Sequence, residues 1–429
     1  MKKINVITLG CSKNTVDSEH LMARLAAAGY EVLFDSDRTD AKVVVINTCG
    51  FIGDAKQESI DMILRAAAAK QAGKIERLFV IGCLSERYAD DLRTEIPEVD
   101  AYFGARTWDG VVRALEASGE PELATERLLT TPKHYAYLKI SEGCNWMCGY
   151  CAIPLIRGPH VSVPMETLEE EARKLAARGV RELIVIAQDI TRYGTDLNGE
   201  HQLAALLREL CKLDFHWIRL HYLYPDDITD ELIDTIAQEK KIVPYLDIPI
   251  QHCNDSILKA MNRRDTKESI RKVFHDLRAR IPGLVLRTSI IAGLPGEGEK
   301  EFEELCDFLR EEKIERAGVF PFSPEEGTKA ATMEHVPMEE AQRRTELLVD
   351  VQSDIIDEYN ESVLGDVREV LCEGWSEEAQ SYVGRSYAES VDIDGKIYFS
   401  AERDIMAGEF VNVRLTGTMD GELTGEAVE

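Results

Sequence analysis

The chain has 429 residues with 78 acidic and 50 basic side chains, which gives a formal net charge of −28 at pH 7. Such a charge repels nucleic acid unless basic groups cluster locally, and it favours a basic partner. The length predicts two or three domains, and no run of about 18 apolar residues is present to span a membrane. The first residues run into a strand-like stretch without a signal-peptide pattern, so we expect a cytoplasmic protein.

Residues 1–118 alternate short apolar runs with amphipathic helical runs. Strands are expected at 5–9, 43–46 and 78–81, with weaker ones near Val32 and Val99, and helices are expected at 16–28 and 56–70. This alternation predicts a parallel sheet covered by helices. Residues 118–132 are rich in turn-forming side chains and are expected to link this unit to the next.

The alternation then restarts. Strands are expected at 135–140, 182–187, 217–221, 245–248, 285–291 and 316–321, with helices at 168–178, 203–210, 228–238, 267–280 and 301–311. Six such units predict an incomplete parallel βα barrel, because eight units usually need about 250 residues. In such barrels the reacting groups lie at the carboxyl ends of the strands. A long helix at 338–362 is expected to close this domain.

The last part of the chain changes to short β-rich runs at 367–372, 382–387, 396–399 and 410–415. The length of this part of the chain fits a small five-stranded all-β barrel. The pair Asp394-Gly395 between two of these runs indicates a hairpin turn.

Three cysteines lie on one short loop after an expected strand, and Cys144, Cys148 and Cys151 have the spacing C-x3-C-x2-C. Three thiolates can hold three irons of a cubane cluster and leave the fourth iron open. An open iron can bind S-adenosylmethionine and pass one electron to it, which produces a radical that abstracts hydrogen from carbon. These three cysteines are therefore the predicted catalytic residues.

A zinc site is the alternative for this loop, but structural zinc usually takes two pairs of Cys or His ligands. No second pair lies nearby, and His160 is the only neighbouring histidine. His160 and Arg157 are interpreted as solvated side chains. The cysteine spacing, with Tyr150 directly before Cys151, resembles the radical S-adenosylmethionine superfamily. By this resemblance Tyr150 is expected to contact the cofactor.

Glycines follow the expected strand at 285–291 in a way that resembles the cofactor-contacting strand end of that superfamily. The residues concerned are Gly293, Gly296 and Glu297. The two glycines would let the backbone approach the adenosine closely. An ordinary Gly-Pro turn is the alternative. Gln188 and its neighbour Asp189 end another strand and are expected to line the same pocket.

A second group of cysteines follows three expected strands of the first unit. Cys11, Cys49 and Cys83 come after the strands at 5–9, 43–46 and 78–81. Since the carboxyl ends of parallel strands share one edge of the sheet, these cysteines are expected to meet in space. Three buried free thiols acting as small hydrophobes are the alternative. The coincidence favours a second three-thiolate cluster.

With both cysteine groups and the β-rich tail placed, the whole chain resembles the methylthiotransferases. The resemblance implies a flavodoxin-like N-terminal domain at 1–118 with an auxiliary 4Fe-4S cluster, a radical S-adenosylmethionine core at 130–361 and a TRAM barrel at 362–429 that recognises substrate. It implies two 4Fe-4S clusters and S-adenosylmethionine as cofactors, together with an external electron donor and a sulfur donor. The cluster on Cys11, Cys49 and Cys83 would hold the sulfur to be transferred.

Two substrate branches exist in this family. One modifies an adenosine of transfer RNA at its 2-position, and the other modifies the β-carbon of an aspartate in the twelfth small-subunit ribosomal protein. Residues 137–143, 221–225, 245–252, 322–328 and 384–387 resemble the second branch. From Ser362 to the end, 15 acidic and 5 basic side chains give a charge of −10. A barrel that grips RNA should be basic, so the charge also favours a basic ribosomal protein over RNA.

Two other functions stay open at this point. The first is the transfer-RNA methylthiotransferase. The second is a non-catalytic iron–sulfur protein that senses redox state or binds a ribosomal component, which would explain the cysteines but leaves the βα barrel and its glycine-rich strand end without a role.

Overall fold

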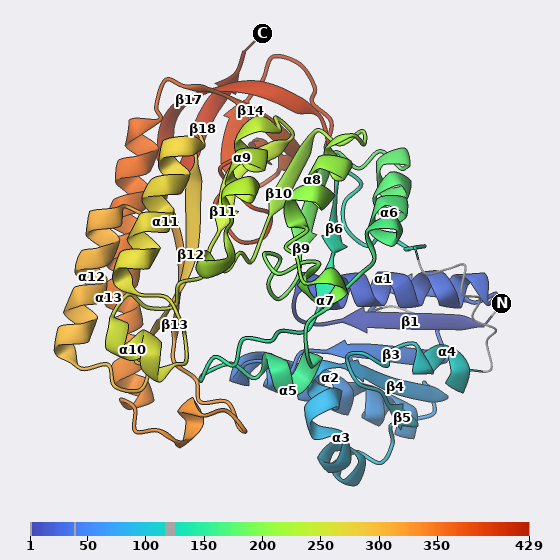
Figure 1. The fold of residues 1–429 in the computed structure, drawn as a ribbon. Helices are drawn as coiled ribbons and strands as arrows, with labels where there is room; N and C mark the ends of the chain where they lie inside the picture. The colour runs from blue at the N-terminus through green and yellow to red at the C-terminus, as the bar shows by residue number, and fades with distance from the viewer. Residues whose placement is uncertain (1, 38–39, 116–124, 429) are drawn as a thin grey trace.

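The computed structural model describes residues 2–37, 40–115 and 125–428, arranged as an N-terminal sheet, an open barrel and a small closed barrel (Figure 1). Much of the expected linker at 118–132 lies outside the described residues. Among the residues that are described, no helix is both long and apolar enough to cross a membrane.

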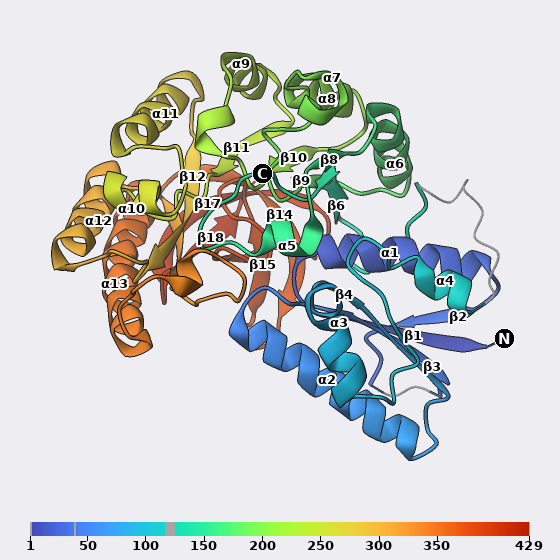
Figure 2. The same cartoon turned by 60° about the horizontal axis from the view of Figure 1, so that its bottom comes forward.

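The N-terminal sheet is parallel, with strand order β2-β1-β3-β4-β5. Its strands are β1 (Lys3–Thr8), β2 (Glu31–Phe34), β3 (Val43–Thr48), β4 (Arg77–Gly82) and β5 (Ala101–Tyr102). One apolar core joins the sheet to α2 (Gly53–Gln71) and α3 (Cys83–Glu95), and another joins it to α1 (Ser12–Ala27) and α4 (Gly110–Ala114) (Figure 2). The predicted doubly covered sheet is confirmed, whereas α3 and α4 were not predicted.

The central unit is a six-stranded parallel sheet with the order β13-β12-β11-β10-β9-β6, which confirms the incomplete barrel. Its strands are β6 (Tyr135–Lys139), β9 (Glu182–Ile186), β10 (Trp217–Leu220), β11 (Ile242–Asp247), β12 (Val285–Ala292) and β13 (Arg316–Pro321). The outer helices are α6 (Met165–Ala177), α8 (Leu203–Cys211), α9 (Asp230–Gln238), α11 (Lys267–Arg280), α12 (Glu299–Glu312) and α13 (Met338–Ser362). The bounds of α11 and α13 agree with the prediction.

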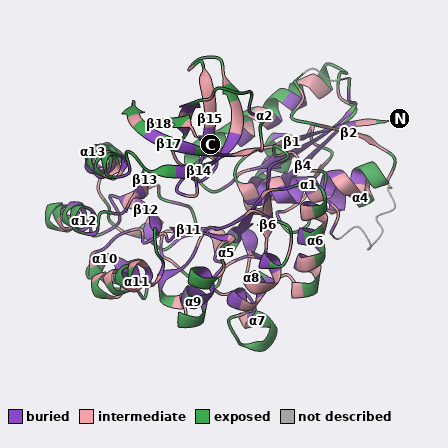
Figure 3. Ribbon diagram, turned by 90° about the horizontal axis from the view of Figure 1, so that it is seen from above, coloured by how far each residue is buried: buried purple, intermediate pink, exposed green. Residues whose placement is uncertain are grey.

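Shorter elements connect these strands at their carboxyl ends. They are the hairpin β7 (Ser141–Glu142) with β8 (Val161–Ser162), the helices α5 (Ile153–Arg157), α7 (Thr195–Asn198) and α10 (Asp255–Ala260), and two 3-10 turns, Pro225–Asp227 and Ala330–Thr332. The side chains that face the outer helices form the largest apolar core of the molecule, and buried residues concentrate there and in the sheets (Figure 3).

The other, concave face of the open barrel is covered by the two flanking units. Val16 of α1 and Val391 of the C-terminal unit pack against Tyr135 and Ile184 of the barrel sheet. A second cluster joins Trp217 and Tyr245 to Leu371 and Ala388. The C-terminal unit therefore closes the barrel interior with its own side chains.

The C-terminal unit is a closed five-stranded barrel of order β14-β15-β16-β18-β17, as predicted. Its strands are β14 (Val367–Ser376), β15 (Ser381–Arg385), β16 (Ile397–Ser400), β17 (Phe410–Met419) and β18 (Glu422–Ala427). The strands β15 and β16 pair antiparallel, but the tight turn predicted at Asp394-Gly395 is wrong, because their connection spans residues 386–396 and packs on the open barrel. There the Asp394 carboxylate accepts a hydrogen bond of 2.6 Å from the Tyr245 hydroxyl. The tight turn is instead Asp420-Gly421, whose φ angles of 51° and 80° suit a hairpin of primed type.

Candidate active site between the two parallel sheets

Cys11, Cys49 and Cys83 meet at the carboxyl edge of the N-terminal sheet, as predicted. Cys11 is the residue before α1, Cys49 follows β3 directly, and Cys83 follows β4 as the first residue of α3. A Cβ atom added at Gly10 would lie 3.2 Å from the Cys49 Sγ. The Cys83 thiol donates to the Asn14 Oδ1 at 3.7 Å. Three adjacent strands thus present three thiols to one another.

Close packing at this edge depends on a glycine. Gly82 has a φ of 102°, and a Cβ atom there would lie 2.4 Å from the Asn47 Oδ1 and 2.5 Å from the Thr48 carbonyl oxygen. Only glycine adopts this backbone conformation without strain and leaves this room. The glycine before Cys83 therefore fixes where the thiol lies relative to β3.

The electrostatics of these thiols suit a cationic ligand. Burial raises the pKa of Cys83 to about 11 and also raises that of Cys49, while the nearby Arg157 guanidinium acts in the opposite direction. The thiolate forms therefore need added positive charge. Iron supplies such charge to coordinating thiolates, and this donor set of three thiols fits an iron–sulfur cluster.

The second group of cysteines lies on the loop between β7 and α5. Its backbone is fixed by neighbouring segments, since the Cys144 N–H donates to the Gly158 carbonyl at 3.0 Å and the Gly149 N–H donates to the Met261 carbonyl at 2.7 Å. Cys144, Cys148 and Cys151 are half-buried. Burial raises the pKa of both Cys144 and Cys151 to about 12. These thiols also need a nearby positive centre to ionise. The loop provides three thiols, which fits the predicted cluster.

Figure 1 shows that α5, which follows this loop, lies beside α3 of the N-terminal unit. Cys83 and Ala105 form one apolar cluster with Ala152 and Ile156, so the two cysteine groups belong to adjoining segments. Within the described ranges, no three Cys, His, Asp or Glu side chains are placed to hold a single metal ion.

Trp146 anchors the cluster loop to the open barrel. Its indole N–H donates to the Asp189 Oδ2 at 2.7 Å, and its ring stacks on Tyr224 with ring centroids 4.0 Å apart. Arg192 and Arg264 lie over the same indole at 5.0 and 5.1 Å. Asp189 therefore holds the cluster loop in place through its hydrogen bond with Trp146.

The side chain of Tyr150, another residue of this loop, is also held by neighbouring segments. Its hydroxyl accepts a hydrogen bond of 3.3 Å from Arg263, and its ring packs against the apolar cluster that contains Met261 and Leu294. Leu294 belongs to the glycine-rich segment, so Tyr150 joins that segment to the cluster loop. Its predicted contact with the cofactor stays a prediction.

The glycine-rich strand end is held by internal contacts. Gly293 has a φ of 83°, and a Cβ atom there would lie 2.7 Å from the Ala341 Cβ. The Glu297 Oε1 accepts from the Gly293 N–H at 2.9 Å and from Arg344 at 2.8 Å, and His252 lies 3.2 Å from its Oε2. Both Glu297 oxygens are thus engaged. A contact of Gly293, Gly296 or Glu297 with S-adenosylmethionine stays a prediction. Because the Glu297 carboxylate is occupied, such a contact would be made by the backbone of this segment.

The expectation that Arg157 and His160 are solvated is wrong. His160 is buried, with its Nε2 3.1 Å from the Ser162 hydroxyl. Arg157 is 2% exposed and donates to the Asp17 Oδ2 at 2.8 Å and to the Glu142 Oε2 at 3.0 Å. The sequence around α5 is mostly apolar and gave no sign that its arginine would bind a carboxylate of the other domain.

Arg157 is part of an interdomain network between α1 and the open barrel, which consists of Asn14, Asp17, Lys139, Glu142, Arg157 and Gln188. Lys139 also binds both Asp17 and Glu142, so two cations face two carboxylates. Gln188 donates to the Glu142 Oε1 at 2.7 Å, and its own Oε1 is buried without a partner in the described structure. That unused acceptor keeps the predicted ligand contact of Gln188 open.

A second ionic contact joins the N-terminal unit to the open barrel. Glu325 receives hydrogen bonds from Arg87 at 2.7 Å and from Lys56 at 3.0 Å, and its side chain is 4% exposed. It lies in the stretch 322–328, whose resemblance was noted, but its partners could not be found from spacing along the chain.

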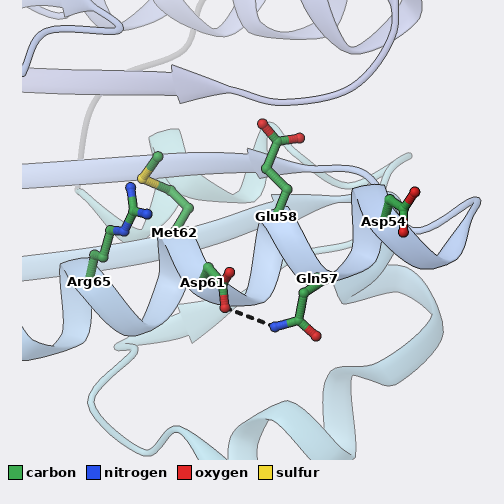
Figure 4. Close-up of a pocket in the computed structure, with 6 residues that line it drawn as sticks. All are labelled: Asp54, Gln57, Glu58, Asp61, Met62 and Arg65. Carbon is green, nitrogen blue, oxygen red and sulfur yellow. Dashed lines mark hydrogen bonds between the residues drawn. The ribbon is translucent and has the colours of Figure 1, made fainter.

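One surface hollow of about 420 Å³ lies elsewhere, along the outer side of α2 (Figure 4). It is lined by Asp54, Gln57, Glu58, Asp61, Met62 and Arg65. These side chains come from a single helix and include no cysteine, so the hollow is separate from the site.

Comparisons with known proteins agree with this arrangement. Residues 138–309 match the radical SAM superfamily, residues 3–104 match a family described as uncharacterized protein family UPF0004, and residues 364–428 match the TRAM domain. TsrM of Kitasatospora setae, a radical S-adenosylmethionine methyltransferase, is 13% identical with a TM-score of 0.54, over 74% of this chain and 73% of that one. The fold and the Cys144–Cys151 loop thus define a radical S-adenosylmethionine enzyme.

Relatives that match over the full length of the chain identify its family more narrowly than the domain matches do. A protein of Cytophaga hutchinsonii is 43% identical over 100% of this chain and 98% of the relative, and one of Flavobacterium johnsoniae is 46% identical over 99% and 98%. Both are named ribosomal protein uS12 methylthiotransferase RimO. The chain belongs to this family of methylthiotransferases.

Proposed function

We propose that the protein methylthiolates the β-carbon of an aspartate in ribosomal protein uS12. The observation that carries the proposal is that two three-cysteine groups, one from each parallel sheet, lie on adjoining segments of an interface that Arg157 bridges. Full-length relatives with the uS12 methylthiotransferase name support the substrate.

In this proposal Cys144, Cys148 and Cys151 hold a 4Fe-4S cluster, and Cys11, Cys49 and Cys83 hold a second one. The bound cofactors supply hydrogen abstraction by a radical, sulfur insertion and methyl transfer from S-adenosylmethionine. The protein fixes the distance between the two groups, excludes water and orients the substrate. Tyr150, Gln188, Gly293, Gly296 and Glu297 are proposed to form the surroundings of S-adenosylmethionine.

An external electron donor and a sulfur donor are further partners in the proposal. The domain division into residues 1–118, 130–361 and 362–429 assigns cluster binding to the first two units and substrate recognition to the third. The described part of each unit contains its own apolar core, which supports this division.

The surface of the C-terminal barrel supports a basic protein as substrate. Two of its five basic side chains, Arg368 and Arg385, are buried against the rest of the protein. The exposed basic side chains are Lys396, Arg403 and Arg414, whereas the exposed acidic ones are Asp366, Glu369, Glu377, Glu378, Asp392, Glu402, Asp404, Asp420 and Glu426. Such a surface repels RNA phosphates and attracts basic proteins, with a salt-dependent association rate.

Anaerobic reconstitution with iron, sulfide, dithionite and S-adenosylmethionine tests the proposal. A uS12 peptide that contains the target aspartate should gain a methylthio group by mass spectrometry, while unmodified transfer RNA should not. Cys144→Ala should abolish 5′-deoxyadenosine formation, and Cys11→Ala should abolish sulfur transfer. Cys372→Ala, at a buried thiol of the C-terminal barrel, is the matched control.

Each alternative has a distinct outcome in this experiment. Modification of transfer RNA without modification of the peptide would establish the nucleic-acid branch. Absence of 5′-deoxyadenosine from a fully reconstituted protein would leave the non-catalytic iron–sulfur protein.

A further inference from the structure

Lys13 is a buried cation whose ammonium contacts no carboxylate. It lies in the first turn of α1, two residues after Cys11, and is 7% exposed. Its Nζ atom lies 3.2 Å from the centroid of the Tyr222 ring of the open barrel. Within the described residues it donates no hydrogen bond and forms no ion pair. A buried ammonium with only an aromatic ring beside it is costly unless an anion arrives.

The other buried cations near this junction already have carboxylate partners of their own. Asp17 and Glu142 face Lys139 and Arg157, so this part of the interdomain network is neutral. Next to it on the barrel, Asp247 pairs with Arg287 at 2.7 Å. Burial lowers the pKa of His221 to about 3, which leaves that ring uncharged at neutral pH. Among the described residues at this junction, Lys13 is therefore the buried cation that lacks an ion-pair partner.

The ammonium is directed toward the barrel. Tyr222 follows β10 in a left-handed conformation, with a φ of 66°, and its N–H donates to the Asp247 Oδ2 at 3.2 Å. Strained residues of this kind persist where the surrounding structure holds them and concentrate at functional sites. Arg157 is among the main charges that act on the Cys49 and Cys83 thiols, and Lys13 is not. The Lys13 ammonium thus faces the end of a barrel strand rather than the Cys49 and Cys83 thiols of its own domain.

We infer that Lys13 binds the side-chain carboxylate of the substrate aspartate and so places its β-carbon beside both cysteine groups. This assignment rests on the proposed function. Lys13 lies on the helix that directly follows Cys11, and the Tyr222 ring belongs to the barrel that carries the other three cysteines. A carboxylate bound there completes the ion pair that the free protein lacks. It also distinguishes aspartate from a neutral residue at the same position in a peptide.

Anaerobic fluorescence anisotropy of the reconstituted holoenzyme tests this role. The probes are a labelled uS12 peptide with the target aspartate and the same peptide with asparagine there. The wild type should bind the aspartate peptide roughly 10- to 100-fold more tightly, as expected for a hydrogen bond between charged groups. Lys13→Met should bind both peptides equally, at the wild-type affinity for the asparagine peptide. Lys13→Arg should keep most of the discrimination.

Lys240→Met, at an exposed lysine that follows α9, is the matched control and should discriminate like the wild type. Unchanged discrimination by Lys13→Met would overturn the assignment. If its iron content fell while discrimination persisted, Lys13 would balance cluster charge instead. If its affinity for S-adenosylmethionine fell instead, the carboxylate would be that of the cofactor. Failure of the wild type to modify the aspartate peptide would overturn the proposed function itself, so the two failures are distinguishable.

Discussion

Glu182 joins the open barrel to the C-terminal barrel, and its replacement by glutamine should measure what that junction contributes to stability. Its Oε1 accepts from the Arg219 Nε at 2.7 Å and its Oε2 accepts from the Arg385 Nη2 at 2.7 Å. None of the three side chains is more than 1% exposed. The variant keeps the shape of the side chain and removes one buried negative charge between two buried arginines.

The magnitude follows from the electrostatics of the carboxyl group. Burial alone would raise its pKa, but Arg385 and Arg219 outweigh that effect and lower the pKa of Glu182 to about 2 from the ordinary 4.5. A difference of about 2.5 pKa units corresponds to roughly 3 kcal/mol at neutral pH. Removing one partner of a buried pair typically costs about 3–5 kcal/mol. Both routes predict that Glu182→Gln lowers the free energy of unfolding by roughly 3 kcal/mol.

Urea denaturation under anaerobic conditions measures this loss, and Glu231→Gln is a suitable control. Glu231 is 60% exposed and pairs with Arg208, so its replacement should cost less than about 1 kcal/mol. The folded-state pKa of Glu182 is depressed, so its contribution is fully present above pH 4.5 and is lost as the pH falls toward 2. The gap between wild type and Glu182→Gln should therefore shrink by about 1.4 kcal/mol per pH unit in that interval. A gap below 1 kcal/mol at pH 7, or one that does not depend on pH below 4.5, would refute the reasoning.

Three further perturbations probe the site. Arg157→Met leaves two carboxylates with Lys139 alone and should lower the free energy of unfolding in urea by roughly 2–4 kcal/mol. The loss should be smaller in a background that carries Asp17→Asn, and additive losses would exclude the coupling. Gly82→Ala should lower iron content from about eight to about four per chain, because its Cβ has no room and its φ is positive; full iron content would contradict this. Trp146→Phe keeps the stacking on Tyr224 but loses the hydrogen bond to Asp189. The rate of 5′-deoxyadenosine formation should fall several-fold and the free energy of unfolding by roughly 1 kcal/mol, whereas a wild-type rate would exclude a role of Trp146 in positioning the loop.

The architecture could be predicted from the sequence because it depends on local patterns. Short apolar runs that alternate with amphipathic runs located every strand of the two parallel sheets, although β5 begins two residues after Val99. The placement of Cys11, Cys49 and Cys83 also followed, since it requires only that parallel strands share a direction. Helix α3 was missed because it is rich in charged residues and contains a kink at Tyr88.

Contacts between distant parts of the chain could not be predicted in the same way. Arg157 meets Asp17 across 140 residues, and Arg385 meets Glu182 across 203. Nothing in the local pattern of an arginine distinguishes a solvated side chain from a buried bridge. The hairpin expected at Asp394-Gly395 failed for a related reason. The loop gains more from burying Val391 and Ala388 on the barrel sheet than from a tight turn.

Two buried ionic contacts cross the interface between the N-terminal unit and the open barrel, one centred on Arg157 and one on Glu325. Apolar contacts of the same size would give equal or greater stability, because buried charges lose much of their attraction to desolvation. Directional charge-assisted hydrogen bonds add a fixed geometry, since each guanidinium binds its carboxylates only in certain orientations. Two metal centres that must act on one substrate carbon need a fixed separation more than they need a strongly stabilised interface. On this argument the ionic bridges set the distance between the two groups, and Lys13, the cation they leave unpaired, is the part of the same interface that remains available for the substrate.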